Sequence, residues 1–165
     1  MKHKQDDFFE KGTEYYEKGE FKKALRLLLK AQKRGDKDYF SHLNIGNVYD
    51  DYAFYQGEKN RKKAKKWFKK GIALGDNSCM VNLAVSYQQE NQMKKAKKWL
   101  KKVVKLGDNE AGFLLAKIYL QEGKIQKAIK LLEVFKGDRL LLNMSEGGQE
   151  DGLKLLEKIR ENILC

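Results

Sequence analysis

Apolar and small residues recur along most of the chain with the period of an α-helix. In the segment 61–74 they fall on one stripe at a spacing of about 3.6 residues, and lysines occupy the opposite side. The chain contains no proline, so nothing interrupts long helices. The segment 94–106 repeats the same arrangement. The pattern predicts an all-α protein. The two stripes consist of Ala64, Trp67, Phe68, Gly71, Ile72 and Leu74, and of Ala96, Trp99, Leu100, Val103 and Val104.

The helical segments are copies of one unit. Similar stretches begin at Ala24, Ala64, Ala96 and Ala128, which are spaced 40, 32 and 32 residues apart. The second copy is longer because of an insertion around residues 55–60, which we expect to lengthen its loop. Four copies in register predict four helical hairpins, at about 5–35, 38–75, 77–107 and 109–137. Each alanine is preceded by a small residue three positions before a tyrosine: Gly12 and Tyr15, Gly46 and Tyr49, Ala84 and Tyr87, Ala116 and Tyr119.

The repeated small residues have a physical reason. Two antiparallel helices can cross closely only where their side chains are small, so we expect the small residue before each tyrosine to face the alanine of the partner helix. Gly-Asp pairs follow the second helices at 35–36, 75–76 and 107–108. Glycine ends a helix cheaply in the left-handed conformation, and aspartate can cap the next helix. A single hairpin cannot bury its apolar face, so neighbouring hairpins must stack.

The order of small residue, tyrosine, alanine, leucine and small residue resembles the tetratricopeptide repeat. The second unit, which carries KKAKKWFKKGIALGD, is similar to the related Sel-one-like repeat. The resemblance covers about residues 5–137 and implies a right-handed α–α superhelix, a solenoid of about four hairpins. The first unit carries the pattern as Gly12, Tyr15, Ala24, Leu28 and Ala31, and the third as Ala84, Tyr87, Ala96, Leu100 and Val103.

The segment 138–165 departs from the repeat. Residues 139–144 are mostly apolar, residues 145–148 are expected to break the chain, and residues 149–163 are amphipathic again. We expect a short helical turn and then a helix that caps the stack, because solenoids need terminal caps. The predicted organisation is therefore one repeat domain over residues 1–165.

The charge of the chain is strongly positive. The formal net charge is +12, and the basic residues are 30 lysines but only 5 arginines. Arginine reads phosphates and bases bidentately, whereas lysine is a hydrated point charge, so this excess favours a solvated surface over a nucleic-acid readout surface. The aromatic residues that could stack on bases are expected to point inward. A basic ridge is nevertheless predicted on the convex side of hairpins two and three: Lys62, Lys66, Lys69, Lys94, Lys98, Lys101, Lys102 and Lys105.

No catalytic constellation stands out, and we predict no enzyme activity, no cofactor and no metal site. A metal site needs three or four converging ligands, and His3 and His42 are the only histidines. Cys79 and Cys165 are far apart and form no CxxC pair, which indicates a reducing, cytoplasmic setting. We expect neither a signal peptide nor a membrane span, which would need about 20 apolar residues.

The tetratricopeptide resemblance implies where a partner would bind. In that architecture the first helix of each hairpin lines a concave groove. The lining is apolar, aromatic, amide and acidic, which suits a peptide with apolar anchors, although the aromatic residues could instead pack within the stack. The groove residues implied by this mapping are Phe9, Thr13, Tyr16, Phe40, Leu43, Asn47, Asp50, Val85, Gln88, Phe113, Lys117 and Leu120.

The leading functional prediction is a protein-interaction module: an adaptor, scaffold or regulator that binds a partner protein or peptide rather than a small-molecule substrate. A specific version is an immunity protein that inhibits a cognate bacterial toxin by direct binding, in which case the basic face would favour an acidic toxin surface. The remaining alternative is binding of RNA or an acidic surface through the lysine-rich convex face.

Overall fold

The computed structural model describes residues 6–34, 39–133 and 146–164. This part of the chain contains nine α-helices and no strand, which confirms the all-α fold class. The chain divides into two compact units, Met1–Gln89 and Glu90–Cys165, and each is described by itself. The predicted third hairpin supplies one helix to each unit. A single domain over residues 1–165 stays a prediction.

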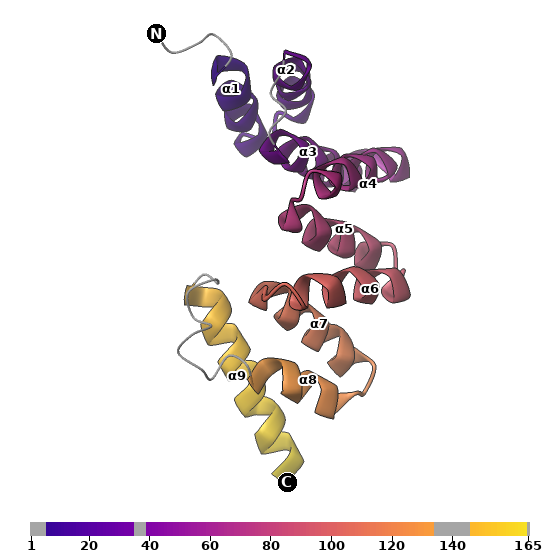
Figure 1. The fold of residues 1–165 in the computed structure, drawn as a ribbon, viewed down its shortest axis with the longest axis vertical. Coiled ribbons are helices and arrows are strands. Elements are labelled where there is room, and N and C mark those ends of the chain that lie inside the picture. The colour runs from indigo at the N-terminus through magenta and orange to yellow at the C-terminus, as the bar shows by residue number, and fades with distance from the viewer. Residues whose placement is uncertain (1–5, 35–38, 134–145, 165) are drawn as a thin grey trace. The chain divides into compact units, whose positions relative to one another are not determined.

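The N-terminal unit contains five helices (Figure 1). They are α1 (Asp6–Glu17), α2 (Phe21–Lys33), α3 (Tyr39–Gln56), α4 (Glu58–Ala73) and α5 (Asn77–Gln89). Each helix packs against the next along the chain, so that α1 pairs with α2 and α3 pairs with α4. Contacts of α2 with α3 and of α4 with α5 join these hairpins to their neighbours. This order of contacts is the predicted stack of hairpins.

The core of the N-terminal unit lies between its first two hairpins. Ala24 and Leu28 of α2 are fully buried and cluster with Ile45 and Val48 of α3. Half-buried aromatic side chains from four helices surround this cluster, including Phe9, Tyr15, Tyr16, Phe21, Tyr49, Tyr52 and Trp67. The aromatic positions of the repeat therefore seal the core of the stack, which agrees with their alternative reading as packing residues.

The helices of each hairpin in this unit approach closely at a glycine. A Cβ atom at Gly12 would lie 2.8 Å from Cγ of Leu28, and one at Gly46 would lie 2.4 Å from Cε1 of Phe68. The nearest groups are thus Leu28 and Phe68, not the repeat alanines that the sequence led us to expect. The reason is helical geometry. Leu28 stands one turn after Ala24, and Phe68 stands one turn after Ala64, so these larger side chains fill the space that the glycines leave.

The insertion in the second unit lengthens helices instead of a loop, so the expected longer loop is wrong. Helix α3 runs to Gln56, ten residues past Gly46, whereas α1, α5 and α7 end five residues past the matching small residue. Helix α4 begins six residues before Ala64, and only Gly57 separates it from α3. Gly57 has φ +82°, a conformation that glycine adopts without strain. No proline or cap residue stops either helix earlier.

The C-terminal unit contains four helices: α6 (Met93–Val104), α7 (Asn109–Gln121), α8 (Ile125–Leu132) and α9 (Glu146–Leu164). Helix α7 packs against α6 and α8, and α9 lies against α8 (yellow and orange in Figure 1). Leu156 and Ile159 of α9 are buried, and Arg160 Nη2 lies 3.0 Å from Glu133 Oε1 at the end of α8. These contacts confirm the predicted capping helix.

The capping helix begins earlier than the sequence suggests. It starts at Glu146 and includes Gly147 and Gly148, which we expected to break the chain. Three consecutive turns of amphipathic sequence follow these glycines, and the packing of α9 against α8 offsets their low helix propensity. The short helical turn expected at 139–144 lies outside the described residues.

Gly-Asp pairs end helices as predicted. Gly75 and Gly107 have φ of +92° and +86°, which places both in the left-handed region. The carboxylate of Asp108 then accepts a hydrogen bond of 2.8 Å from the backbone N–H of Ala111 in the first turn of α7. Asp76 caps α5 in the same way through the N–H of Ser78. The pair at 35–36 lies outside the described residues.

Two glycine substitutions test the packing argument with opposite signs. Gly46→Ala should lower the free energy of unfolding by about 1 kcal/mol, because overpacking a core costs about 1–3 kcal/mol and exceeds the gain in helix propensity of about 1 kcal/mol. Gly112→Ala should raise it by about 0.5–1 kcal/mol, since nothing lies within 4 Å of its Cβ position. Urea denaturation measures both; equal effects would contradict the close helix approach at Gly46.

Candidate functional site

A cavity of about 490 Å³ opens between α7 and α9 of the C-terminal unit. Helix α7 contributes Phe113, Lys117, Leu120 and Gln121, and α9 contributes Asp151, Lys154, Leu155 and Lys158. Three of these side chains, Phe113, Lys117 and Leu120, are groove residues that the sequence predicts. The structure therefore brings the fourth-hairpin part of the predicted groove together in one hollow.

The packing of the two helices decides which side chains reach the cavity. Leu115, Ala116, Ile118 and Tyr119 of α7 are buried, and α7 packs against α6 and α8. Residues 113, 117 and 120 stand at intervals of four and three, so they share a different face of the same helix. On α9, Leu156 and Ile159 are buried while Leu155 remains half-buried at the cavity. Each helix thus buries one stripe of side chains and presents another to the cavity.

The cavity combines apolar and basic groups. Phe113, Leu120 and Leu155 are half-buried, whereas Lys117, Lys154 and Lys158 are exposed. The Lys117 ammonium lies 5.4 Å from the centre of the Phe113 ring, within the range of a cation–π interaction. Asp151 is the one carboxylate among the described side chains that line the cavity. The described lining of the cavity is therefore both apolar and charged.

Sequence reasoning missed the α9 side of this cavity. The resemblance to known repeats ends near residue 137, so it implied no binding role for the capping helix. The signal that could have indicated one is the spacing of Asp151, Leu155 and Lys158 on one face of an amphipathic helix. That spacing alone does not say which face of another helix lies opposite.

The predicted groove residues of the N-terminal unit are partly used by the fold itself. The Tyr16 hydroxyl donates a hydrogen bond of 2.5 Å to Asp51 Oδ2, which links α1 to α3. Burial and this hydrogen bond raise the pKa of Tyr16 above its ordinary value. The Asn82 amide donates to Asn47 Oδ1 at 2.6 Å and links α5 to α3. These side chains hold neighbouring hairpins together.

Other predicted groove residues of this unit have mixed roles. Phe9 and Tyr16 pack against the core cluster. The Thr13 hydroxyl donates to the carbonyl oxygen of Phe9, one turn earlier in α1. The side chain of Phe40 lies outside the described residues. The remaining four, Leu43, Asp50, Val85 and Gln88, are half-buried on α3 and α5.

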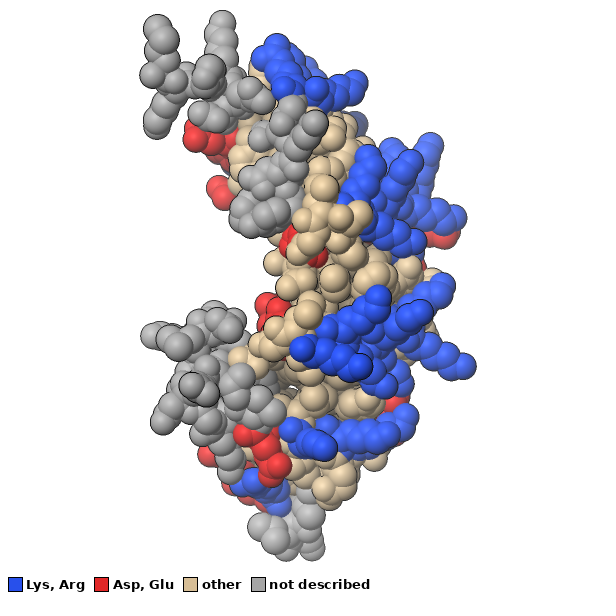
Figure 2. All heavy atoms as spheres, viewed as in Figure 1, with Lys and Arg blue, Asp and Glu red and all other residues tan. Residues whose placement is uncertain are grey.

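The predicted basic ridge falls on α4 and α6. Lys62, Lys66 and Lys69 of α4 are exposed, and Lys62 pairs with Glu58 at 3.0 Å. In Figure 2, basic side chains of the C-terminal unit gather over α6. Six of them line a hollow of about 410 Å³: Lys94, Lys97, Lys98, Lys101, Lys102 and Lys105. The two lysine sets belong to different units, so the continuity of the ridge stays a prediction.

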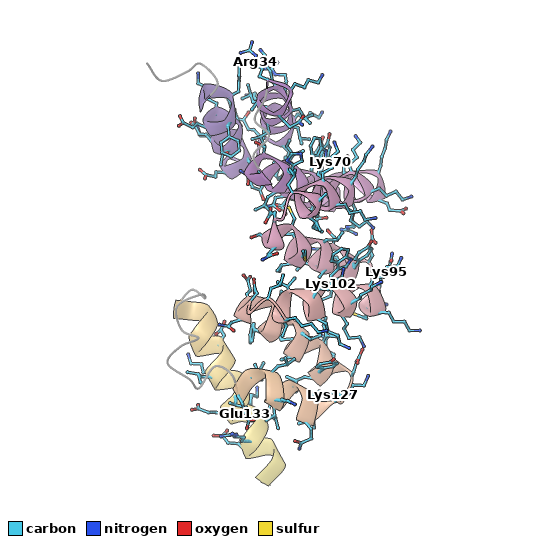
Figure 3. The ribbon with its side chains drawn as sticks, viewed as in Figure 1. Arg34, Lys70, Lys95, Lys102, Lys127 and Glu133 are labelled. Carbon is cyan, nitrogen blue, oxygen red and sulfur yellow. The ribbon has the colours of Figure 1, made fainter. Side chains whose placement is uncertain are left out.

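The sequence led us to expect both tryptophans to point inward, but the structure buries them only in part. Trp67 and Trp99 are half-buried. The Lys70 ammonium lies 4.0 Å from the centre of the Trp67 ring, and that of Lys102 lies 4.7 Å from the centre of the Trp99 ring (labelled lysines in Figure 3). Each tryptophan therefore supports a lysine three residues later, through a cation–π interaction.

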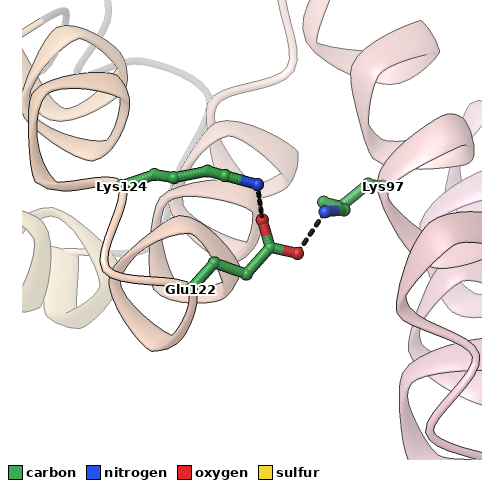
Figure 4. Close-up of polar contacts among 3 residues, drawn as sticks. All are labelled: Lys97, Glu122 and Lys124. Carbon is green, nitrogen blue, oxygen red and sulfur yellow. Dashed lines mark hydrogen bonds and ion pairs between the residues drawn. The ribbon is translucent and has the colours of Figure 1, made fainter.

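One lysine of the α6 hollow is already neutralised. Glu122, in the turn between α7 and α8, accepts hydrogen bonds from Lys97 of α6 and from Lys124, the latter at 2.7 Å (Figure 4). Hydrogen bonds from Lys124 and Lys97 lower the pKa of the Glu122 carboxyl to about 2. The side chains of Lys97 and Glu122 are 17% and 25% exposed, whereas Lys62 and Glu58 of α4 are 69% and 73% exposed. The Lys97–Glu122 ion pair is thus less exposed to solvent than the Lys62–Glu58 ion pair.

Cys79 has a structural environment. Its thiol is buried and donates a hydrogen bond of 2.9 Å to Asp76 Oδ2, and a Cβ atom at Gly71 would lie 2.4 Å from its sulfur. Burial and the Asp76 carboxylate raise the pKa of this thiol, which disfavours the nucleophilic thiolate. His42 is also buried and its ring lies 5.5 Å from the centre of the Trp67 ring. In the part of the chain that the structure describes, no three His, Cys, Asp or Glu side chains converge as metal ligands.

The Glu122 cluster makes stability depend on pH. Because the folded-state pKa of Glu122 lies below its ordinary value of 4.5, the stabilisation is complete above about pH 4.5 and is lost as the pH falls towards 2. Glu122→Gln should therefore lower the free energy of unfolding at pH 7, and its difference from the wild type should vanish near pH 2.

Chemical denaturation at a series of pH values measures this difference. Glu157→Gln is the matched control, because Glu157 is an exposed residue of α9 that has no ion pair with the described residues. A pH dependence for Glu122→Gln equal to that of the control would contradict the role of the cluster.

Comparison with known sequences gives one match. Residues 78–107, which span α5 and α6, match the family model of the tetratricopeptide repeat. No curated protein sequence shows significant similarity to the chain. None of the described helices combines the length and the apolar character that are needed to cross a membrane.

Comparison with solved structures extends over almost the whole chain. Human IFIT1, solved as a dimer with PPP-AAAA, superposes with a TM-score of 0.79 at 18% identity, covering 99% of this chain and 41% of IFIT1. The chain thus spans less than half the length of IFIT1. A tetratricopeptide repeat protein from Parabacteroides merdae gives a TM-score of 0.67 at 19% identity and covers 96% of this chain and 60% of that chain.

A Sel1 repeat protein from Oxalobacter formigenes gives a TM-score of 0.56 at 24% identity, covering 76% of this chain and 53% of that chain. These low identities show the fold alone. Together with the matched repeat and the stacked hairpins, they confirm the resemblance that the sequence carries. The described helices thus have the fold of tetratricopeptide and Sel1 repeat proteins, and residues 78–107 match the tetratricopeptide repeat itself.

Proposed function

We propose that this chain is a protein-interaction module that binds a segment of a partner protein in the cavity between α7 and α9. Tetratricopeptide repeats suggest a scaffold for protein–protein contacts. The observation that carries the proposal is the convergence of Phe113, Lys117 and Leu120 with Leu155 of α9 in one hollow. The first three were predicted as groove residues from the sequence, independently of the cavity.

The form of the cavity supports a macromolecular segment as its ligand. Its volume of about 490 Å³ falls within the usual range of binding sites, about 300–1,000 Å³. Its apolar side chains are half-buried, and its charged side chains are exposed. Interfaces that bind through a few anchor side chains have this arrangement, with the anchors in an apolar centre and polar groups around them.

Substitutions in the cavity test this proposal. Phe113→Ala and Lys117→Glu should each weaken partner binding, the former by about thirtyfold, because losing an aromatic anchor costs about 2 kcal/mol or more. Affinity purification from the native organism with mass spectrometry identifies the partner, and calorimetry then measures its affinity for each variant.

Lys130→Glu is the matched control, since Lys130 is an exposed lysine of α8 that does not line the cavity. Circular dichroism checks that all variants are folded. If the partner binds Phe113→Ala and Lys117→Glu as tightly as the wild type, the cavity is not the binding site.

A second candidate function rests on the lysines of α6. Lys94, Lys98, Lys101 and Lys105 have no ion pair with the described residues, although they stand three or four residues apart. Like charges at this spacing destabilise a helix by about 0.2–0.5 kcal/mol per pair, and an anionic partner would relieve the repulsion. Such a partner could be the acidic surface of a cognate toxin, as in the immunity-protein version of the function, or a nucleic acid. Human IFIT1 was solved with PPP-AAAA, which makes a nucleic acid a reasonable first probe.

Salt dependence tests the α6 lysines. Single-stranded RNA should bind weakly at about 50 mM salt, and the logarithm of its affinity should fall with the logarithm of salt concentration by about 0.7 per phosphate contact. The double variant Lys98→Glu/Lys101→Glu should reduce this slope, whereas Lys117→Glu should not. Fluorescence anisotropy measures both quantities. Absence of binding at about 50 mM salt would remove nucleic acid from the candidates.

A further inference from the structure

We infer that the anionic partner of α6 is the surface of a membrane that carries acidic lipids, on which a row of lysines docks. The inference rests on the second candidate function, an anionic partner for the α6 lysines, and names the chemistry of that partner. The contact is with the headgroups of the bilayer, so no helix needs to cross it. The α6 lysine row consists of Lys94, Lys98 and Lys101 of α6 and of Lys105 at its C-terminal cap.

The α6 lysine row lies on the outer side of its helix. Its members stand four, three and four residues apart, so they share one face over about 16 Å of helix. All four are exposed, and basic side chains project from α6 in Figure 2. The buried residues of the same helix lie on the opposite face, at Ala96, Leu100 and Val103. A flat surface can therefore touch the whole row without disturbing the packing of α6.

Carboxylates of the described residues leave the charge of this row intact. Helix α6 contains no aspartate or glutamate. Helix α7 packs against α6, but Asp108 caps α7 and Glu122, in the turn after it, pairs with Lys97. Glu110 of α7 is exposed and has no ion pair with the described residues. The four lysines of the row likewise have none, so the row presents four positive charges to solvent.

The composition of this face disfavours a protein surface as the partner. The centres of protein interfaces are poor in lysine, and their anchors are mostly aromatic residues and arginine. Among the described residues, lysines alone line the hollow of about 410 Å³ on α6. The nearby Trp99 is half-buried, and the Lys102 ammonium lies 4.7 Å from the centre of its ring. The hollow therefore lacks an apolar or aromatic residue that a partner's anchor could contact.

The same composition favours lipid headgroups over a nucleic acid. No arginine is among the described residues that line the hollow, so bidentate phosphate contacts are missing, and no aromatic ring there can stack on a base. A bilayer needs neither, because its headgroups move laterally and adjust to point charges. Clusters of about four to eight basic residues on an amphipathic helix are typical of contacts with anionic lipids. Each such lysine strengthens binding by about fivefold.

An exposed leucine adjoins the α6 lysine row. Leu106 directly follows Lys105 and is 59% exposed. Its backbone N–H donates a hydrogen bond of 2.9 Å to the carbonyl oxygen of Val103, which holds it in the last turn. Beside a membrane, a leucine enters the headgroup region while the long lysine side chains reach the charged groups. An RNA backbone offers no comparable apolar environment for Leu106.

Cosedimentation with vesicles tests the inference. The full chain is mixed with vesicles of phosphatidylcholine containing about one third phosphatidylserine, and with vesicles of phosphatidylcholine alone, at about 50 and about 150 mM salt. Lys98→Gln/Lys101→Gln removes two charges of the row, and Leu106→Ser removes the apolar group. The matched control, Lys127→Gln/Lys130→Gln, removes two exposed lysines of α8. Circular dichroism checks that each variant is folded, and fluorescence anisotropy measures binding of single-stranded RNA and of a polyglutamate peptide.

The wild type should bind the vesicles that contain phosphatidylserine and not those of phosphatidylcholine alone. Lys98→Gln/Lys101→Gln should bind about twenty-fivefold more weakly, fivefold for each charge, whereas the α8 control should stay within about twofold of the wild type. Leu106→Ser should weaken vesicle binding and leave RNA binding unchanged. An excess of RNA should leave the wild type on the vesicles at about 150 mM salt.

Contrary results separate the inference from the function on which it rests. If the vesicles do not bind, or if RNA displaces them, while RNA or polyglutamate binds through Lys98 and Lys101, the partner is not a membrane and the second candidate function stands. Vesicle binding that Lys98→Gln/Lys101→Gln and Leu106→Ser leave unchanged would place the membrane contact elsewhere and overturn the inference. If no probe binds at about 50 mM salt, or if the α8 control loses as much affinity as the row variant, both fail.

Discussion

The close approach of paired helices is the constraint on which the N-terminal unit depends. At Gly12 and Gly46 the backbone of one helix leaves room for Leu28 or Phe68 of its partner, and even a methyl group would collide there. The fully buried Ala24 and Ala64 stand one turn before these side chains. Small residues therefore fix the separation of the two helices, and that separation decides which faces remain for neighbouring hairpins and for ligands.

The sequence predicted the parts of the fold that depend on local patterns. Helical periodicity located the paired helices, and the glycines at 75 and 107 marked helix ends. Only the α7 side of the cavity could be predicted from the sequence. Phe113, Lys117 and Leu120 follow from the position of α7 in a repeat, but an amphipathic helix such as α9 carries no signal for the surface that it will border.

Contacts between residues far apart in the sequence explain the other differences. Tyr16 and Asn47 were expected to face a partner, yet Tyr16 bonds to Asp51 and Asn47 to Asn82, each 35 residues away in the sequence and on another helix. Polar residues on a concave face can bind a ligand or bind each other, and sequence patterns do not distinguish these cases. The same holds for Lys97, whose ion pair with Glu122 depends on the turn between α7 and α8.

The one-residue connection at Gly57 has a consequence for how such repeats change length. Six additional residues lengthen two antiparallel helices at their shared tip, after Gly46 in α3 and before Ala64 in α4. An extra residue inside a helix would rotate everything after it by about 100° and move buried side chains to the surface. Extra residues at the tip leave Gly46 and Ala64 in phase. Hairpin tips are therefore where a helical-repeat chain can accept foreign sequence, and the Gly57 corner is a natural point for grafting a tag or a binding epitope.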